Sequence, residues 1–341
     1  MANRSKRGRK RKATWSLWTE RRVPSEYEVV SHKLNHTFGN NPAPFHLDKN
    51  APMNQWYLKY REGSQFQVDD WEAFRDPKRL TYRDYVTLQN EKELYLGNLI
   101  DDFEKDEDHY TKLSEGWINT LEYLYIPYRF SGHILQIVAL YMAQIAPSAY
   151  ISNVGYFQGG DELRRLQHNS YFAKVLSLEL NRPKLADTES TRTIWEKDPH
   201  WQPMRELLEK LMIAYDWGES FAALNLVVKP LYDALYNVQF AQLAYKNGDE
   251  LLNLMHNNFN LDTDRFKNWT KELVKYSVER RSENQDLLKN WIEDWRGLAY
   301  RAIDGLAPLF EQAPHQMSAE DVTKAVRKSH HDFLVDLGLE Q

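Results

Sequence analysis

Asp262-Thr263-Asp264-Arg265-Phe266 is the stretch that decides the fold, and it lies in a helical pattern that continues to Tyr276. Residues three apart share one face of a helix, so Thr263 and Phe266 are expected to point the same way. Helical bundles bind metal with Glu-x-x-His at this spacing, but a hydroxyl and a phenyl ring cannot replace those iron ligands. If this stretch is a helix of a bundle, positions 263 and 266 on its shared face cannot bind iron. Asp, Thr and Arg are also common where helices begin, which is the alternative explanation.

Length and composition limit the classes of protein that fit. A chain of 341 residues can bury roughly three quarters of its extended surface, so one large helical domain or two smaller ones would fit. The net charge of −5 gives no general attraction to nucleic acid. Because the chain has no cysteine, it cannot form disulfides, thiolate nucleophiles or iron–sulfur clusters.

Hydropathy gives no reason to expect a membrane protein. No stretch reaches about eighteen uninterrupted apolar residues, the length that spans a bilayer. The basic N-terminus is not followed by the apolar segment of a signal peptide. We therefore expect a cytoplasmic protein that does not contact the membrane.

Residues 1–12 are expected to form a disordered basic tail. The block from Arg4 to Lys12 is dense in Lys and Arg and has no apolar residue to pack. Such a block can bind nucleic acid, and deleting it would test this alternative by salt-dependent DNA binding. A solvated tail is the favoured interpretation, because the run has no aromatic residue and no folded basic module follows.

Residues 13–78 are expected to form an extended aromatic docking arm. Several prolines interrupt the segment, which cannot build its own core yet carries many large rings. Large aromatic rings are typical anchors of protein interfaces. The interface candidates are Trp15, Trp18, Tyr27, Trp56, Tyr57 and Trp71. The alternative is a long irregular segment that wraps over its own domain.

Helical patterns dominate from residue 79 to the end, and the fold class is predicted to be all-α. A helical domain over 79–313 would be followed by a helical tail over 314–341, whose helix Ser318 should cap. The longest pattern runs from Pro203 to Tyr245, and Pro230 should kink or split it. Its middle is apolar nearly all round, so this helix should be central and buried. A short helix over 251–255 is expected before the Asp262 helix.

A search for metal ligands finds no usable set. No glutamate is followed three residues later by a histidine. Glu162-Leu-Arg-Arg165 has arginine in the histidine position, and an arginine forms an ion pair sooner than it binds a cation. A buried polar network is the favoured account of Glu219 and of Asn225-Lys229, because a buried lysine needs a partner.

Other chemistry has little support in the sequence. There is no G-x-S-x-G elbow, no P-loop and no G-x-G-x-x-G motif. An alternative to a non-catalytic protein is an oxidase of the ferritin type with unusual carboxylate ligands. Its candidate ligands would be Glu122, Glu162, Glu219 and Asp264. Metal analysis of the isolated chain distinguishes the two.

Several blocks resemble one known family, covering about residues 14–300. The chain is similar to the β subunit of the hydroxylase in bacterial multicomponent di-iron monooxygenases, nearest the toluene, alkene and isoprene branch. The blocks are Trp15-Ser-x-Trp18, Pro24-Ser-Glu-Tyr-Glu-Val-Val-Ser31, Asp76-Pro77 with Leu80-Thr-Tyr-Arg-Asp-Tyr85, Ile145-Ala-Pro-Ser-Ala-Tyr-Ile-Ser-Asn153, Trp195-Glu-Lys-Asp-Pro199, Asp216-Trp-Gly-Glu-Ser-Phe221, Leu224-Asn-Leu-Val-Val-Lys-Pro230 and Trp269-Thr-Lys-Glu-Leu-Val-Lys275.

The resemblance implies a ferritin-like (ribonucleotide-reductase-like) bundle of long helices with an extended N-terminal arm. It implies an (αβγ)₂ hydroxylase in which only the α subunit holds the di-iron centre and the second β protomer helps to build the dimer. In the family's metal-binding motif, Thr263 stands in the place of the bridging Glu and Phe266 in the place of the His. No cofactor, metal or catalytic residue is then expected on this chain.

The expected function is that of a non-catalytic structural subunit. The enzyme would be an NADH-dependent monooxygenase that oxidises hydrocarbons by alkene epoxidation or aromatic hydroxylation. A γ subunit, an effector protein, a Rieske ferredoxin and a reductase would complete the system. The substrate pocket would lie on another polypeptide, so this sequence does not select the hydrocarbon.

Overall fold

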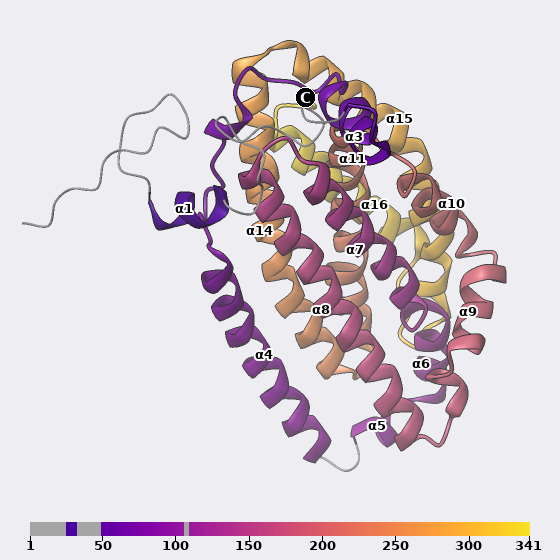
Figure 1. The fold of residues 1–341 in the computed structure, drawn as a ribbon. Helices are drawn as coiled ribbons and strands as arrows, with labels where there is room; N and C mark the ends of the chain where they lie inside the picture. The colour runs from indigo at the N-terminus through magenta and orange to yellow at the C-terminus, as the bar shows by residue number, and fades with distance from the viewer. Residues whose placement is uncertain (1–24, 33–48, 106–108) are drawn as a thin grey trace, which may run out of the picture.

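The computed structural model describes residues 25–32, 49–105 and 109–341. Within these ranges the chain is helical and contains no strand, which confirms the all-α prediction. The long helices lie side by side in an elongated bundle (Figure 1). The basic tail over 1–12 and the candidates Trp15 and Trp18 lie outside the described residues.

Four long helical segments form the centre of the bundle: α7 (Tyr128–Ile145), α8 (Ala149–Glu179), a central rod over 217–246 and α14 (Glu250–Arg280). The turn between α7 and α8 is short because Ser148 caps α8, accepting a hydrogen bond from the backbone N–H of Tyr150. Glycines let the two helices approach closely: a Cβ at Gly155 would lie 2.8 Å from Ala143 Cβ. These small residues fix the spacing on which the bundle is built.

The central rod is one continuous helix with two wide π-helical stretches. It consists of α11 (Trp217–Phe221), η5 (Ala222–Val228), α12 (Lys229–Asp233), η6 (Ala234–Phe240) and α13 (Ala241–Lys246). Pro230 does not split it, because the proline lies in the first turn of α12, directly after a wide turn. The rod is buried through its middle, as predicted.

Two predicted helix boundaries were wrong. The pattern starting at Pro203 contains two helices, since α10 (Gln202–Leu211) ends before Asp216 begins the rod. The Asp216 carboxylate accepts hydrogen bonds from the N–H groups of Gly218 and Glu219, which satisfies a new helix start. In contrast, α14 is a single helix where two were expected, because burial of its apolar face outweighs the weak helix propensity of its asparagines.

The remaining helices surround this centre (Figure 1). Helix α4 packs against α14 and is hydrogen-bonded to α8 where Tyr85 and Gln89 donate to Asp161, while α15 and α16 cover the rod. The outer long helices are α4 (Tyr82–Lys105), α9 (Thr188–Lys197), α15 (Glu283–Leu306) and α16 (Ala319–Asp336). The short elements are α1 (Glu26–His32), α3 (Pro52–Tyr57), η1 (Leu58–Glu62), η2 (Trp71–Ala73), α5 (His109–Lys112), α6 (Glu115–Thr120), η3 (Leu121–Tyr125), η4 (Pro183–Leu185) and η7 (Ala307–Gln312).

The C-terminal helix α16 packs into the same core as the bundle. Ser318 caps it as predicted, accepting a hydrogen bond from the N–H of Asp321. His330 donates a hydrogen bond over 2.8 Å to the carbonyl of Leu226, which lies in the π-helical stretch η5. A π-helical stretch departs from the regular helical hydrogen-bond pattern, so α16 gives the rod an additional tie at this point. No helix among the described residues is long and apolar enough to cross a membrane.

Candidate functional site

The two positions that the family resemblance aligns with metal ligands, Thr263 and Phe266, face the interior of the bundle. Thr263 and Phe266 lie on the inner face of α14, and both are buried, whereas Asp264 is exposed on the opposite side. Thr263 Oγ1 donates to Asp233 Oδ2 over 2.8 Å. Asn237 donates to the same hydroxyl over 3.1 Å. The threonine is therefore part of a hydrogen-bonded network that links α14 to the rod.

The network centres on four charged residues, which we call the core ion cluster: Glu162, Arg165, Lys229 and Asp233. Lys229 Nζ lies 2.5 Å from Glu162 Oε1 and 2.9 Å from Asp233 Oδ2. Arg165 donates to Asp233 Oδ1 over 2.6 Å. Every member is buried, so the ions are screened from solvent and held by one another. This confirms the expected partner for Lys229 and the expected ion pairing of Arg165.

The core ion cluster is neutral, with two carboxylates and two cations. Burial opposes ionisation of Asp233, but Arg165 and Lys229 outweigh it and lower the pKa of this carboxyl to about 2. The phenyl ring of Phe266 lies against the ammonium of Lys229, 4.7 Å from Nζ to the ring centroid. Thr263 and Phe266 thus contact the ion cluster through a hydroxyl and a ring face.

His256 is linked to this network through Asn237, and sequence reasoning missed it. Its Nδ1 lies 3.0 Å from Asn237 Oδ1, and burial together with the nearby Arg165 lowers its pKa to about 3. It is held against an amide and packs among aromatic rings such as Tyr125 and Phe240. No spacing in the sequence connects His256 to a metal motif, so no signal could have found it.

These residues do not fit a di-iron centre. Iron sites of this type need several carboxylates and imidazoles that converge on the metals. Here an ammonium and a guanidinium already lie beside the two inward carboxylates, where they would repel a metal cation. No group of three histidines or carboxylates in the described part of the chain could hold a metal ion.

The alternative ligand set is not brought together. Glu162 is buried in the core ion cluster, whereas Asp264 is exposed on the outer face of α14. Glu219 faces α15, where it accepts a hydrogen bond from Trp295 Nε1 over 3.2 Å. Glu122 lies on η3, a separate element, and is half-buried. The four carboxylates therefore do not converge on one place where a metal ion could bind.

A second charged network holds α4 against the bundle. Asp262 binds Lys92 Nζ over 2.5 Å and Arg164 over 3.0 Å, and Gln89 donates to it over 2.9 Å. Burial raises the pKa of Asp262, but Arg265, Lys92 and Arg164 outweigh this and hold it well below its usual value. Asp262 was singled out in the sequence, yet it binds α4 and does not join the core ion cluster.

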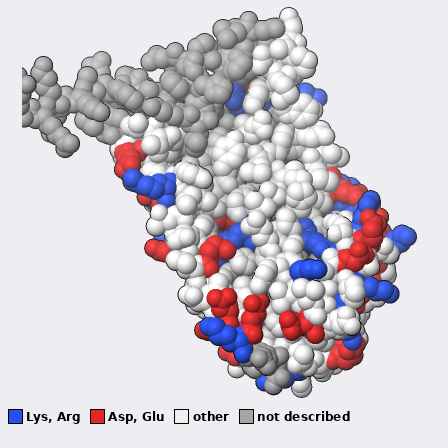
Figure 2. All heavy atoms as spheres, turned by 60° about the horizontal axis from the view of Figure 1, so that its bottom comes forward, with Lys and Arg blue, Asp and Glu red and all other residues white. Residues whose placement is uncertain are grey.

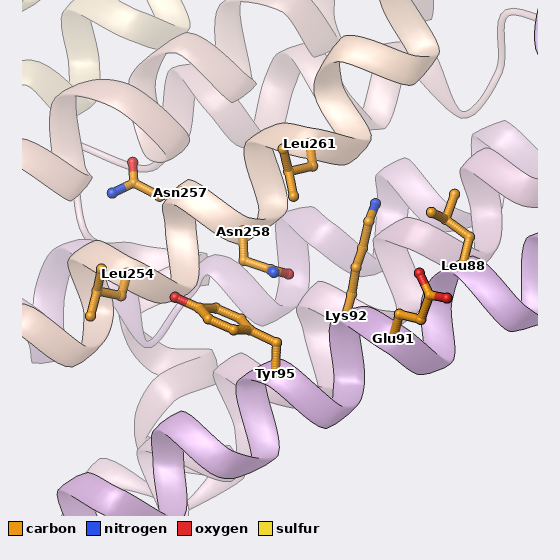
Figure 3. A pocket seen from close by; sticks show the side chains of 8 residues that line it. All are labelled: Leu88, Glu91, Lys92, Tyr95, Leu254, Asn257, Asn258 and Leu261. Atoms are coloured by element: carbon orange, nitrogen blue, oxygen red, sulfur yellow. The ribbon is translucent and has the colours of Figure 1, made fainter.

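An open groove of about 480 Å³ lies beside this second network, between α4 and α14 (Figure 3). Leucines form much of its wall, and Tyr95 and two asparagines add polar atoms. The lining residues are Leu88, Glu91, Lys92, Tyr95, Leu254, Asn257, Asn258 and Leu261.

The outer surface of α7 and α8 carries no exposed charge between residues 130 and 173. The four charged residues of that range, Asp161, Glu162, Arg164 and Arg165, are all buried. Exposed side chains on the same helices include Ile137, Tyr156 and Leu163, and we call these three the outer face. Figure 2 shows uncharged side chains over a broad area, with Lys, Arg, Asp and Glu gathered toward the end that is lowest in Figure 1.

An aromatic group adjoins the outer face. Trp56 Nε1 donates to Tyr141 Oη over 3.0 Å, and the ring centroid of Trp56 lies 4.8 Å from that of Tyr215. Burial raises the pKa of the Tyr156 phenol on α8, and the phenol of Tyr57 on α3 raises it further. Both Trp56 and Tyr57 are half-buried. These two interface candidates therefore extend the uncharged surface of α7 and α8.

Two other interface candidates belong to the chain's own core. Trp71 is buried, with its ring centroid 5.1 Å from that of Trp217. Tyr27 is buried beside Tyr150, at 5.6 Å between centroids. For these rings the structure matches the alternative in which the segment wraps over its own domain.

Comparisons with known proteins agree with this geometry. Residues 56–281 match the methane/phenol/alkene hydroxylase family. The chain is 41% identical to the β subunit of the toluene-4-monooxygenase hydroxylase component of Ectopseudomonas mendocina, over 85% of this chain and 88% of that one. It is 24% identical to the small subunit of the propane 2-monooxygenase hydroxylase component of Gordonia sp. (strain TY-5), over 74% and 69%.

Solved structures show the same helical fold. A structure of toluene 4-monooxygenase with toluene bound in its resting active site matches with a TM-score of 0.82 at 40% identity, covering 89% of this chain and 98% of that one. Phenol hydroxylase from Pseudomonas sp. OX1 matches with a TM-score of 0.77 at 21% identity, covering 93% and 92%, which supports the fold alone. The predicted hydroxylase bundle of long helices is thereby confirmed.

Proposed function

Because the chain belongs to the methane/phenol/alkene hydroxylase family, we propose that it is the β-type subunit of a monooxygenase hydroxylase that oxidises hydrocarbons. In this proposal it is structural, and the di-iron centre lies in a catalytic α-type partner. A γ subunit and a second copy of this chain would complete the hydroxylase. An effector protein, a Rieske ferredoxin and a reductase would serve it in the cytoplasm. An iron centre bound in the partner would supply the oxygen chemistry.

The observation that carries the non-catalytic role is the core ion cluster. A buried lysine and a buried arginine neutralise the two inward carboxylates. The centre of this bundle therefore carries no unbalanced charge that a metal ion would have to offset. The chain's own residues then fix helix positions and exclude water from the core. In this proposal the chain contributes a rigid body of long helices to the hydroxylase.

The outer face supports the role of partner-binding subunit. An exposed surface with apolar side chains and no charge is typical of a permanent protein interface and costly to leave in water. The half-buried rings of Trp56 and Tyr57 enlarge it with the residue types that anchor interfaces. We propose that the catalytic partner covers this surface.

Co-expression with the catalytic partner tests the proposal. An affinity-tagged form of the full chain should retain the untagged partner through gel filtration. Ile137→Asp and Leu163→Asp should each sharply reduce the retained partner, because a charge would be buried at the contact. Tyr245→Asp is the matched control, since Tyr245 is also exposed but lies on α13, away from α7 and α8. Equal loss in all three variants, or loss in none, would overturn this assignment of the surface.

A further inference from the structure

The open groove between α4 and α14 has the dimensions of a site for one helix. Its two walls, residues 88–95 of α4 and 254–261 of α14, each span two helical turns, which is about 10 Å. Three leucines and the ring of Tyr95 make the lining mainly apolar (Figure 3). A helix that binds in such a groove inserts apolar side chains at positions i, i+3 or i+4, and i+7, which also span two turns.

The groove leaves apolar side chains in contact with solvent. Leu261 is 52% exposed and Tyr95 is 48% exposed. Leu88 and Leu254 are half-buried on the two facing walls. Covering these side chains would remove apolar surface from water, which favours binding of an apolar helix face.

The free charge at the groove is negative. Glu91 is exposed on the α4 wall and forms no ion pair with the described residues. Lys92, the cation of the same wall, is buried and pairs with Asp262. A lysine or arginine of a partner would complement the charge of Glu91. The occupant therefore needs an apolar face with a basic residue beside it.

Helix α4 connects this groove to the outer face. Tyr85 of α4 stacks on Phe157 of α8, with 4.2 Å between the ring centroids. The same helix exposes two more apolar side chains, Val86 and Leu94, which do not line the groove. A partner that covers the outer face of α7 and α8 would meet α4 next and reach the groove beyond it.

We propose that the groove between α4 and α14 binds an amphipathic helix of the catalytic partner. Its apolar side chains would contact Leu88, Leu254 and Leu261, and a lysine or arginine would lie beside Glu91. The inference deepens the proposed function and rests on it, because it adds a second contact to the one assigned to the outer face. Both contacts together would hold α4 between the bundle and the partner.

Retention of the co-expressed catalytic partner by the tagged full chain tests the groove. Leu261→Asp and Glu91→Lys should each reduce the retained partner at least about tenfold, because the first buries a charge and the second opposes two cations. Both side chains are exposed, so thermal unfolding of the isolated variants should stay close to wild type.

Val335→Asp and Glu279→Lys are the matched controls. Val335 is exposed on α16. Glu279 is exposed near the end of α14, about 27 Å along the helix from Leu261. Both controls should retain the catalytic partner as wild type does.

A photo-cross-linker identifies the occupant. Benzoylphenylalanine is placed at position 95 in the co-expressed hydroxylase, which is purified and irradiated, and the linked peptides are identified by mass spectrometry. The expected product joins position 95 to a segment of the catalytic partner that carries a lysine or arginine, and Glu91→Lys should reduce its yield. A link to a second copy of this chain, to its own residues 1–24 or to no protein would overturn the proposal.

The results separate this inference from the proposed function. If Ile137→Asp loses the partner but Leu261→Asp and Glu91→Lys retain it, the groove assignment is overturned and the outer face stands. Equal loss in the groove variants and in their controls also overturns the groove assignment. If Leu261→Asp does not fold, Glu91→Lys and the cross-link decide. If wild type retains no partner, the proposed function fails and this inference fails with it.

Discussion

The ammonium of Lys229 lies 2.5 Å from the carboxylate of Glu162, and both side chains are almost fully buried. The pair joins the central rod to α8 at the depth where Thr263 and Phe266 point inward from α14. A buried ion pair contributes little compared with apolar packing, but losing one partner is costly. The core ion cluster should therefore be sensitive to single substitutions.

Asp233→Asn should strongly destabilise the chain. It removes the negative charge that Arg165 and Lys229 share and leaves two buried cations with one carboxylate. The expected loss is about 3–5 kcal/mol in the free energy of unfolding, measured by urea denaturation. Asp264→Asn, at an exposed position of α14, should change it by less than about 0.5 kcal/mol. Equal values for the two variants would contradict a structural role for the cluster.

His330→Gln should weaken the dependence of stability on pH. Burial lowers the pKa of His330 to about 4, although its hydrogen bond to Leu226 acts in the opposite direction. The unfolded chain therefore takes up the proton first, and the stability this histidine contributes is complete above about pH 6.5 and is lost as the pH falls toward 4. The slope is at most about 1.4 kcal/mol per pH unit.

Urea denaturation of wild type and His330→Gln at several pH values between 7 and 4 measures this difference. Glutamine does not titrate, so the variant should lose less stability than wild type over the range. His133→Gln, at an exposed histidine of α7, should follow wild type throughout. Parallel curves for wild type and His330→Gln would show that the imidazole ionises freely in the folded chain.

Gly155→Ala should destabilise the pairing of α7 with α8. The added Cβ would lie 2.8 Å from Ala143 Cβ and 3.1 Å from the Ala143 backbone, which cannot rotate away. We expect a loss of about 1–3 kcal/mol by thermal unfolding. Gly97→Ala on α4 meets nothing within 4 Å and should gain about 0.5–1 kcal/mol. A gain in both variants would mean that the two helices are not held this closely.

Comparing Trp71→Ala with Tyr57→Ala distinguishes a ring that packs in the core from a ring that contacts the partner. Because Trp71 packs against Trp217 and Phe66, its loss should cost the isolated chain about 3–5 kcal/mol in unfolding free energy. Tyr57→Ala, at a half-buried ring, should cost far less but should reduce retention of the catalytic partner. The opposite pattern would mean that Trp71 serves docking and Tyr57 serves the core.

Sequence patterns identified the long helices well because each buries a continuous apolar stripe. That Thr263 and Phe266 share one face of α14 also followed from spacing alone, and the structure shows that this face is buried. The π-helical stretches of the rod did not, since they depend on how neighbouring helices fill the core around Pro230. Weak helix formers in α14 suggested a break that tertiary packing removes.

The core ion cluster was only half visible in the sequence. A buried Lys229 was expected to need an acidic partner. Asp233 lies four residues later on the same helix face, so the spacing could have identified it as that partner. Arg165 and Asp233 are 68 positions apart, so only the fold brings them together. The uncharged outer face was likewise hidden, because four charged residues within its sequence range turn inward.

Metal content of the wild-type chain tests the central claim most directly. The full chain should be expressed in iron-replete cells, alone and together with its catalytic partner, and iron should be measured per chain. The account predicts only trace iron on the isolated chain and stoichiometric iron in the assembly. Stoichiometric iron on the isolated chain, lost on substitution of Glu162 or Asp233, would contradict it.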